Sequence, residues 1–317
     1  MSQPRMIDSD CVEICQRTLL GAHRFVQTAL VQQLIIYALA RACQLAGVEL
    51  VSAVFMSSHY HVMIRGGTPR QIAAFTRTLN SLLARGMNRL QGGIGQFWCN
   101  KRPQVTPLHG MTVYDRLRYI LCNPLRACIA RNRREYAGVI LTPEDLKRKI
   151  VAELPVEAFG PDTKMPESIV LAQGIPTTQI GDVGADVFIE TCNQLVDEAE
   201  AKLLGEFARA GKTPPAKHTM ERRIAEKWDE RAWYHKADDE KERERERSKK
   251  GGPPRFFAKG AEAVKREEQR QAKFQALYRD AMREYCDDPN AIVEFPHGTL
   301  KMSGDPRVVV SAERIEV

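Results

Sequence analysis

Apolar positions in the first 150 residues alternate between short β-branched or aromatic runs and longer stretches with helical spacing. The short runs predict strands at residues 11–18, 48–55, 59–65 and 96–105. Apolar residues three or four positions apart predict helices at residues 28–45, 68–90 and 112–124. The first two helices are followed by Gly47 and by Gly92-Gly93, which are stop signals. The predicted order is therefore βαββαβα.

This order predicts an α+β fold, with a single antiparallel sheet and helices packed on one face. The opposite face of the sheet would then be available for a ligand. Thr112-x-x-Asp115 resembles a capping box with Asp in place of Glu, so the third helix is expected to begin there.

The composition changes after residue 150, which predicts a domain of residues 1–150 and a charged, mostly helical C-terminal extension of residues 151–317. Helices are predicted at 185–211, 220–250 and 256–285, with a break at GGPP, residues 251–254. Residues 291–302 alternate apolar and polar around Pro296, which predicts a terminal hairpin. No residue pattern assigns a role to this extension.

Positive charge is concentrated in the first domain. Residues 1–150 hold 20 Lys and Arg against 8 Asp and Glu, whereas the remainder holds 27 against 32, which together give the net charge of +7. Between residues 50 and 134 there are thirteen basic residues and one acidic residue, Asp115. Solvated helix faces usually mix both signs, so this segment favours a surface that binds a polyanion such as nucleic acid.

Other sequence features bear on the cellular location of the protein, on membrane association and on the state of its cysteines. The N-terminal MSQPRMIDSD has no apolar core preceded by positive charge, so no signal peptide and a cytoplasmic location are expected. The apolar stretch 29–55 is interrupted by polar residues, which indicates a soluble helix and strand and no membrane partner. The eight cysteines form no CxxC pair, which is typical of reduced thiols.

The segment SSHYHVMIRGG, residues 57–67, places two histidines one residue apart on a predicted strand. Residues i and i+2 of a strand point to the same face. His59 and His61 are therefore expected side by side, with Tyr60 on the other face. Such a pair is either half of a metal site or two buried polar residues, and the histidines alone leave both open.

A second group of chemical residues lies on the predicted third helix, DRLRYILCNPLRA. Tyr119 and Asn123 are four residues apart and share a helix face, although Pro124 disfavours helical geometry at Asn123. Two imidazoles and an amide oxygen can hold one divalent cation with open positions. A phosphodiester bound there would be polarised, and a nearby tyrosine could attack its phosphorus.

HYH followed by Val, Met and Ile, and YILCNPLRA on a later helix, resemble the single-tyrosine HUH transposases, whose fold is ferredoxin-like. The nearest branch is the REP-associated tyrosine transposases, in which a Tyr-x-x-x-Asn-Pro element is characteristic. The likeness runs from about residue 12 to residue 136 and does not cover the second half of the chain. Ser58 stands where Asn is common in the family.

The resemblance implies a metal site at His59, His61 and Asn123, with Mg²⁺ or Mn²⁺ as cofactor, and Tyr119 as nucleophile. It implies metal-dependent cleavage and rejoining of single-stranded or hairpin DNA through a 5′-phosphotyrosine, the reaction of a transposase. Relatives often act as homodimers, which the long extension leaves open here. The basic residues expected to contact DNA are Arg65, Arg102, Arg116, Arg118 and Arg126, with Arg131, Arg133 and Arg134 as an outer patch.

Two other functions are compatible with the same residues. A catalytically silent, transposase-derived protein would bind hairpin DNA or structured RNA without cutting it. A hydrolytic metal site would use water in place of a covalent step, but this leaves Tyr119 without a role. The joint presence of His59, His61, Tyr119 and Asn123 favours the covalent enzyme.

Overall fold

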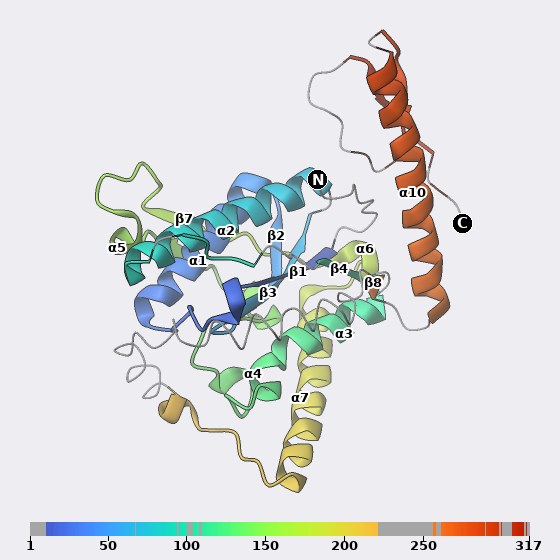
Figure 1. Cartoon of the computed structure of the whole chain (residues 1–317). Coiled ribbons are helices and arrows are strands. Elements are labelled where there is room, and N and C mark those ends of the chain that lie inside the picture. Colours follow the sequence, from blue (N-terminus) through green and yellow to red (C-terminus); the bar gives the residue numbers. More distant parts are fainter. Residues whose placement is uncertain are drawn as a thin grey trace.

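The computed structural model describes residues 11–66, 68–93, 95–99, 104–107, 110–220, 256–257, 261–288, 290–297, 299, 306–313 and 315. Its first elements are β1 (Cys11–Arg17), α1 (Ala29–Ala46), β2 (Glu49–Phe55), β3 (His59–Arg65), α2 (Pro69–Gln91), β4 (Gln104–Pro107) and α3 (Gly110–Leu121) (Figure 1). This order is the predicted βαββαβα.

One sheet joins strands of the first part of the chain with β8 from the second half, in the strand order β5-β2-β3-β1-β4-β8. β5 covers Ile140–Leu141 and β8 covers Phe256–Phe257. The strands from β5 to β4 pair antiparallel, whereas β8 pairs with β4 in parallel. The antiparallel core of β2, β3, β1 and β4 confirms the α+β class and places the histidine strand β3 in the interior of the sheet.

The ends of α1 and α2 follow from local sequence. Thr28 caps α1 by accepting a hydrogen bond from the backbone nitrogen of Val31, and Gly47 ends it with a left-handed φ of 65°. At the start of α2, Thr68 and Gln71 form a capping box. Both helices therefore match the predicted ranges to within one or two residues.

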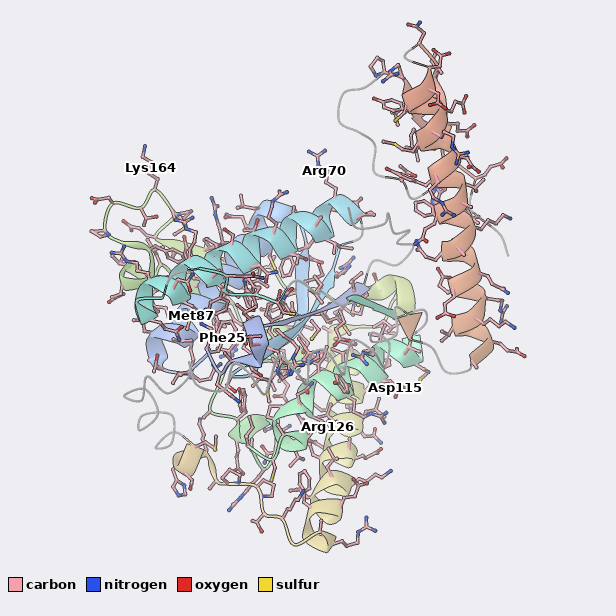
Figure 2. The ribbon with its side chains drawn as sticks, viewed as in Figure 1. Phe25, Arg70, Met87, Asp115, Arg126 and Lys164 are labelled. Carbon is pink, nitrogen blue, oxygen red and sulfur yellow. The ribbon has the colours of Figure 1, made fainter. Side chains whose placement is uncertain are left out.

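α1 and α2 together cover one face of the sheet (Figure 1). Phe25 packs edge-on against Phe55, and Tyr60 points from β3 into the same apolar layer. In Figure 2, Phe25 lies inside this layer, whereas Arg70 and Lys164 project outwards. Of the described helices, α1 alone is long and apolar enough to cross a membrane, and more than half of it is buried, as in the core helix of a folded domain.

α3 lies against the opposite face of the sheet, in contrast to the prediction of helices on one face only (Figure 1). Val113, Leu117 and Ile120 of α3 pack against Val54 and Met63 of the sheet. Alternate side chains of these strands are apolar on this face too, and burying them stabilises the fold. The face that was expected to remain free is partly covered, and α3 crosses it beside the histidines.

The fourth strand and the start of α3 also differ from the prediction. A strand was expected at 96–105. Trp98 bridges Thr18, β4 covers Gln104–Pro107, and residues 100–103 between them lie outside the described residues. The aromatic run is apolar because Phe97 and Trp98 pack into the core. α3 begins before Thr112, which is buried within the helix and does not cap it.

The predicted domain boundary at residue 150 does not coincide with a break in packing. β6 (Val151–Glu153) pairs with β7 (Ser168–Val170), and α5 (Val156–Phe159) lies between them in sequence. Ala152 and Ile169 belong to the same core as α1. The segment that follows residue 150 therefore completes the first domain.

The second half of the chain contains α7 (Ala185–Arg209), α10 (Ala261–Asp287), β9 (Val293–Phe295) and β10 (Val308–Val310). α7 and α10 confirm two of the three predicted helices, and the third, at 220–250, lies outside the described residues beyond Met220. β9 pairs in parallel with β10, and the second strand of the predicted hairpin, up to residue 302, lies outside the described residues from residue 300 on. Short helical segments are α4 (Asn123–Arg126), α6 (Thr177–Ile180), Leu19–Gly21, Arg133–Glu135 and Pro143–Lys147.

Candidate active site

The two histidines of β3 lie on the sheet face that α3 crosses. Their ring centroids are 5.2 Å apart and the ring planes are nearly perpendicular, at 82°. Tyr60 points to the other face, where its hydroxyl donates to Asn80 Oδ1 of α2 at 2.8 Å. The strand periodicity therefore places both imidazoles together, as predicted.

The Nδ1 atom of each imidazole has a polar neighbour. Ser58 Oγ lies 3.2 Å from His59 Nδ1, and Glu13 Oε1 lies 2.8 Å from His61 Nδ1. His61 Nε2 is 3.8 Å from the Sγ atom of Cys15, its partner on β1. Both Nδ1 atoms are engaged, and Nε2 of His61 faces the Cys15 thiol, so a ligand at that nitrogen has to displace the thiol contact.

The two imidazoles differ in charge preference. Burial, with His61, Arg17 and His23 nearby, lowers the pKa of His59 to about 3. Burial also opposes protonation of His61, but Cys15 and the Glu13 carboxylate outweigh it and raise the pKa of His61 to about 9. His59 is therefore a neutral nitrogen donor, and a metal at His61 has to displace a proton.

Tyr119 extends from α3 towards this pair. Its ring meets the His61 ring edge-on, with the centroids 5.5 Å apart. The guanidinium of Arg116 lies 4.4 Å from the centroid of the Tyr119 ring, and that of Arg126, on α4, lies 5.6 Å from it. A phenol, two imidazoles and two guanidinium groups thus meet at one place, which sequence spacing could only suggest.

Asn123 is placed at the junction of α3 and α4. Its Nδ2 donates to the backbone carbonyl of Tyr119 at 3.0 Å and is 3.4 Å from that of Ile120. The amide thereby caps the last turn of α3, which ends before Pro124. Neither of these bonds uses the amide oxygen Oδ1.

The paired imidazoles supply two of the donors that a divalent cation with open positions needs. Among the described residues there is no group of three or more His, Cys, Asp or Glu side chains arranged for a metal ion. His59 and His61 are thus the two nitrogen donors that lie together at this site. Amide oxygen and water are ligands that suit Mn²⁺ and Mg²⁺, whereas imidazole nitrogens suit transition-metal ions.

The other arginines that were expected to bind DNA are dispersed. The side chains of Arg65 and Arg118 each pair with one carboxylate and remain more than a third exposed. Arg131 is also exposed. Arg102 lies outside the described residues. Arg65, Arg118 and Arg131 thus keep surface for an anionic ligand.

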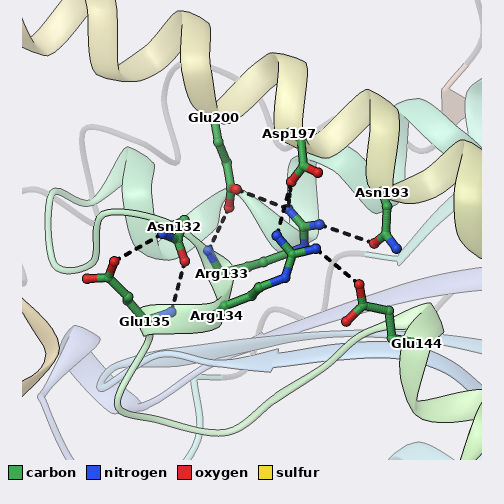
Figure 3. A network of polar contacts seen from close by, with 8 residues as sticks. All are labelled: Asn132, Arg133, Arg134, Glu135, Glu144, Asn193, Asp197 and Glu200. Carbon is green, nitrogen blue, oxygen red and sulfur yellow. Dashed lines mark hydrogen bonds and ion pairs between the residues drawn. The ribbon is translucent and has the colours of Figure 1, made fainter.

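Arg133 differs from the prediction of a DNA contact because it is buried in a polar network with α7 (Figure 3). Its guanidinium bonds to Asp197 Oδ1 at 2.5 Å, Glu200 Oε2 at 3.0 Å and Asn193 Oδ1 at 3.1 Å. Its backbone nitrogen also donates to Glu200 Oε1 at 2.6 Å. With a side chain 0% exposed, Arg133 has no surface for a phosphate.

Arg134 lies next to it and is bound to Glu144 and to Asp197, although its side chain is half exposed (Figure 3). The predicted outer patch is therefore partly neutralised by Glu144 and by acids of α7. Phe188, Cys192, Val196 and Glu200 form one face of α7, four residues apart, and this face packs beneath α3 and α4.

Sequence reasoning missed Glu13 as a member of the site. A signal was present, because Cys11, Glu13 and Cys15 share one face of the predicted first strand and a lone acid there is unusual. Its partners could not be inferred, because they come from β3 and α3. The aromatic residues Phe97 and Trp98 are core residues, and Tyr114 packs against Phe188 of α7.

Comparisons with known proteins give limited likeness. No protein-family model matches the chain, and no curated protein matches it. Among solved structures, a REP-associated tyrosine transposase bound to a REP hairpin matches with 14% identity and a TM-score of 0.39, over 55% of this chain and 99% of that one. A candidate transposase from Deinococcus radiodurans R1 matches with 20% identity and a TM-score of 0.27, over 35% of this chain and 87% of that one.

Both matched structures are described as transposases, the class that the HYH and YILCNPLRA motifs resemble. Their TM-scores are below 0.5, so the likeness in overall structure does not decide what this protein does. The function has to be argued from the residues of the site.

Proposed function

We propose that this protein is a transposase-type DNA strand transferase that uses Tyr119 as its nucleophile on single-stranded or hairpin DNA. The observation that carries the proposal is the edge contact of Tyr119 with His61, beside His59 and beneath Arg116. A tyrosine packed only for stability has no need of two imidazoles and a guanidinium around it.

In the proposed reaction, Tyr119 Oη attacks the phosphorus of a phosphodiester. The Oη–P bond forms and the P–O3′ bond breaks, so the product is a 5′-phosphotyrosine and a strand that ends in a 3′-hydroxyl. The phenol loses its proton and the leaving 3′ oxygen gains one. Attack of a 3′-hydroxyl on the phosphotyrosine reverses these steps and joins the strands again, with no external energy source.

Each side chain has a role that follows from its position. His59, His61 and Asn123 would hold Mg²⁺ or Mn²⁺, which when bound supplies Lewis-acid polarisation of the phosphodiester. Arg116 and Arg126 place positive charge at the Tyr119 ring, where the scissile phosphate has to approach. His61 and Tyr119 belong to one chain, so a single copy carries all the parts.

Charge supports DNA as the substrate. Phosphate contacts dominate affinity for nucleic acids, and the segment between residues 50 and 134 has thirteen basic residues against one acidic residue. Of the arginines predicted to contact DNA, Arg126 and Arg131 are exposed, and Arg65 and Arg118 are partly exposed. Unpaired bases of a single strand or hairpin would be the elements that carry sequence information.

The test is formation of a covalent protein–DNA band with labelled hairpin oligonucleotides taken from repeats flanking the gene. The wild-type protein is compared with Tyr119→Phe and His61→Ala in the presence of Mg²⁺ or Mn²⁺. Tyr114→Phe is the matched control, because it removes a hydroxyl from the same helix at a residue that packs against Phe188, away from the histidines.

The proposal requires a band with wild type and with Tyr114→Phe that is lost in Tyr119→Phe and in His61→Ala. Tight hairpin binding without a band, for several repeats and both metals, would favour the silent binding protein. Cleavage that survives Tyr119→Phe would show that water or another residue is the nucleophile.

A further inference from the structure

Glu13 is a buried carboxylate shared by two residues of the candidate active site. It lies on β1 with a side chain that is 1% exposed. Oε1 is 2.8 Å from Nδ1 of His61, and Oε2 accepts from Nε of Arg116 at 2.5 Å and also from its Nη2. Both oxygens are thus used, one by the histidine strand and one by the tyrosine helix.

At the His61 end, the carboxylate determines which ring nitrogen carries a proton. An ionised carboxylate only accepts hydrogen bonds, so the Nδ1 atom that faces it has to be the protonated one. Nε2 is then the nitrogen whose lone pair can bind a cation in place of its contact with Cys15 Sγ, which lies 3.8 Å away. Carboxylates in this position behind a metal-binding histidine fix both its tautomer and its ring orientation.

At the Arg116 end, the same carboxylate fixes a guanidinium above the Tyr119 ring. A free arginine side chain populates many rotamers, and holding it in one costs conformational entropy. The buried, two-point contact with Glu13 meets that cost before any substrate binds. The antiparallel pairing of β1 with β3 brings Glu13 close to His61, because Glu13 pairs with Met63, two residues beyond His61 on β3.

We propose that Glu13 is a positioning residue that couples the cation-binding nitrogen of His61 to the guanidinium over Tyr119. This inference rests on the proposed function, and it adds a residue that neither sequence motif contains. Glu13 does not touch the substrate or the reacting atoms. It sets the position of one group that holds the cation and of one group that lies against the nucleophile.

Two substitutions distinguish the contact of Glu13 with His61 from its contact with Arg116. Glu13→Gln keeps an oxygen that can accept from His61 Nδ1 but turns an amide NH₂ towards Arg116, so only the Arg116 link is lost. Glu13→Leu removes both links at similar volume. Glu49→Gln is the matched control, because Glu49 makes an analogous pair with Arg65 on the same sheet but away from the site.

The first measurement is Mn²⁺ affinity by electron paramagnetic resonance, on folded protein without DNA. Glu13→Leu should bind Mn²⁺ about 10- to 100-fold more weakly than wild type, whereas Glu13→Gln and Glu49→Gln should bind within a few-fold. The second is a long-range ¹H–¹⁵N spectrum of histidine-labelled, Mg²⁺-loaded protein. His61 should show a protonated Nδ1 in wild type and Glu13→Gln, and a mixture of tautomers in Glu13→Leu.

The third measurement is the covalent DNA band, for which Glu13→Gln should lower the rate while hairpin affinity is unchanged. A purely structural role for Glu13 would lower the unfolding midpoint but leave the tautomer and the metal affinity as they are, and this result overturns the proposal. Wild type that binds no Mn²⁺ also overturns it. If the metal and tautomer results are as expected but no variant forms a covalent band, the proposed function fails and the positioning role of Glu13 stands.

Discussion

The buried ion pair between Arg133 and Glu200 gives the sharpest prediction of stability. The side chain of Arg133 is 0% exposed and that of Glu200 is 6% exposed, whereas the side chain of Asp197, which also binds Arg133, is 51% exposed. Glu200→Ala leaves a buried guanidinium that cannot lose its proton. Asp197→Ala removes a partner that is largely in water.

Breaking a buried pair by removing one partner costs about 3–5 kcal/mol. Glu200→Ala should therefore lower the free energy of unfolding by about that amount, which for a domain of this size lowers Tm by roughly 6–20 °C. Asp197→Ala should cost less than about 1 kcal/mol, the usual range for an exposed pair. Urea unfolding followed by circular dichroism measures both variants against wild type.

Arg133→Met, which removes the other partner of the ion pair, should make the stability depend on pH. Burial raises the pKa of Glu200 above its ordinary value, and Arg133→Met removes the main charge that opposes this. With a folded pKa above the unfolded one, protonation of Glu200 stabilises the variant fully below the unfolded pKa of about 4.3. That stabilisation is lost as the pH rises through the folded pKa, so Arg133→Met should be closer to wild type at pH 5 than at pH 8.

Equal losses for Glu200→Ala and Asp197→Ala would refute the reasoning, because burial would then not determine the cost. A Glu200→Ala variant within 1 kcal/mol of wild type would refute it too. The double variant Arg133→Met, Glu200→Leu is the remaining control. It replaces both charges by apolar groups and should regain most of the loss.

Two further predictions concern packing and a buried hydroxyl. Gly86→Ala should lower the free energy of unfolding by about 1–2 kcal/mol, because the added Cβ would lie 2.7 Å from Leu34 Cδ1 and Cδ2, although alanine favours the helix. Gly205 on α7 has open space around it. Gly205→Ala should therefore raise the free energy of unfolding by up to about 1 kcal/mol in the same denaturation assay. Tyr136→Phe should cost only about 1 kcal/mol, since the carbonyl of Phe55 that accepts from Tyr136 also accepts from Gln27. Burial raises the pKa of Tyr136, so wild type should lose stability above pH ~10 more steeply than Tyr136→Phe in unfolding measured across that range.

The sequence was sufficient for features that depend on neighbours along the chain. Thr28, Gly47 and Thr68 set the ends of α1 and α2 through caps that involve only the adjacent turn. The period of two on β3 placed His59 and His61 on one face. The spacing of four on the third helix placed Tyr119 and Asn123 at the same end of it.

Features that depend on distant partners could not be predicted. The role of Glu13 requires the pairing of β1 with β3, and the burial of Arg133 requires a helix 67 residues further on. From sequence alone, a basic residue in a basic segment is predicted to contact DNA, because its acidic partners are not known. The same limit explains the boundary at residue 150, because composition changes there although the apolar residues of β6 and β7 still pack on α1.

The position of α7 has a consequence for the order in which the protein is made. Arg133 and the helix bearing Tyr119 leave the ribosome before Glu200, which lies 67 residues later in the chain. At 5–20 residues per second, this interval is roughly 3–13 s. During that time α3 lacks the helix that packs beneath it, so the nascent chain already carries its histidine pair and tyrosine but not the support that fixes their geometry. Completion of the site is thereby tied to synthesis of the C-terminal half.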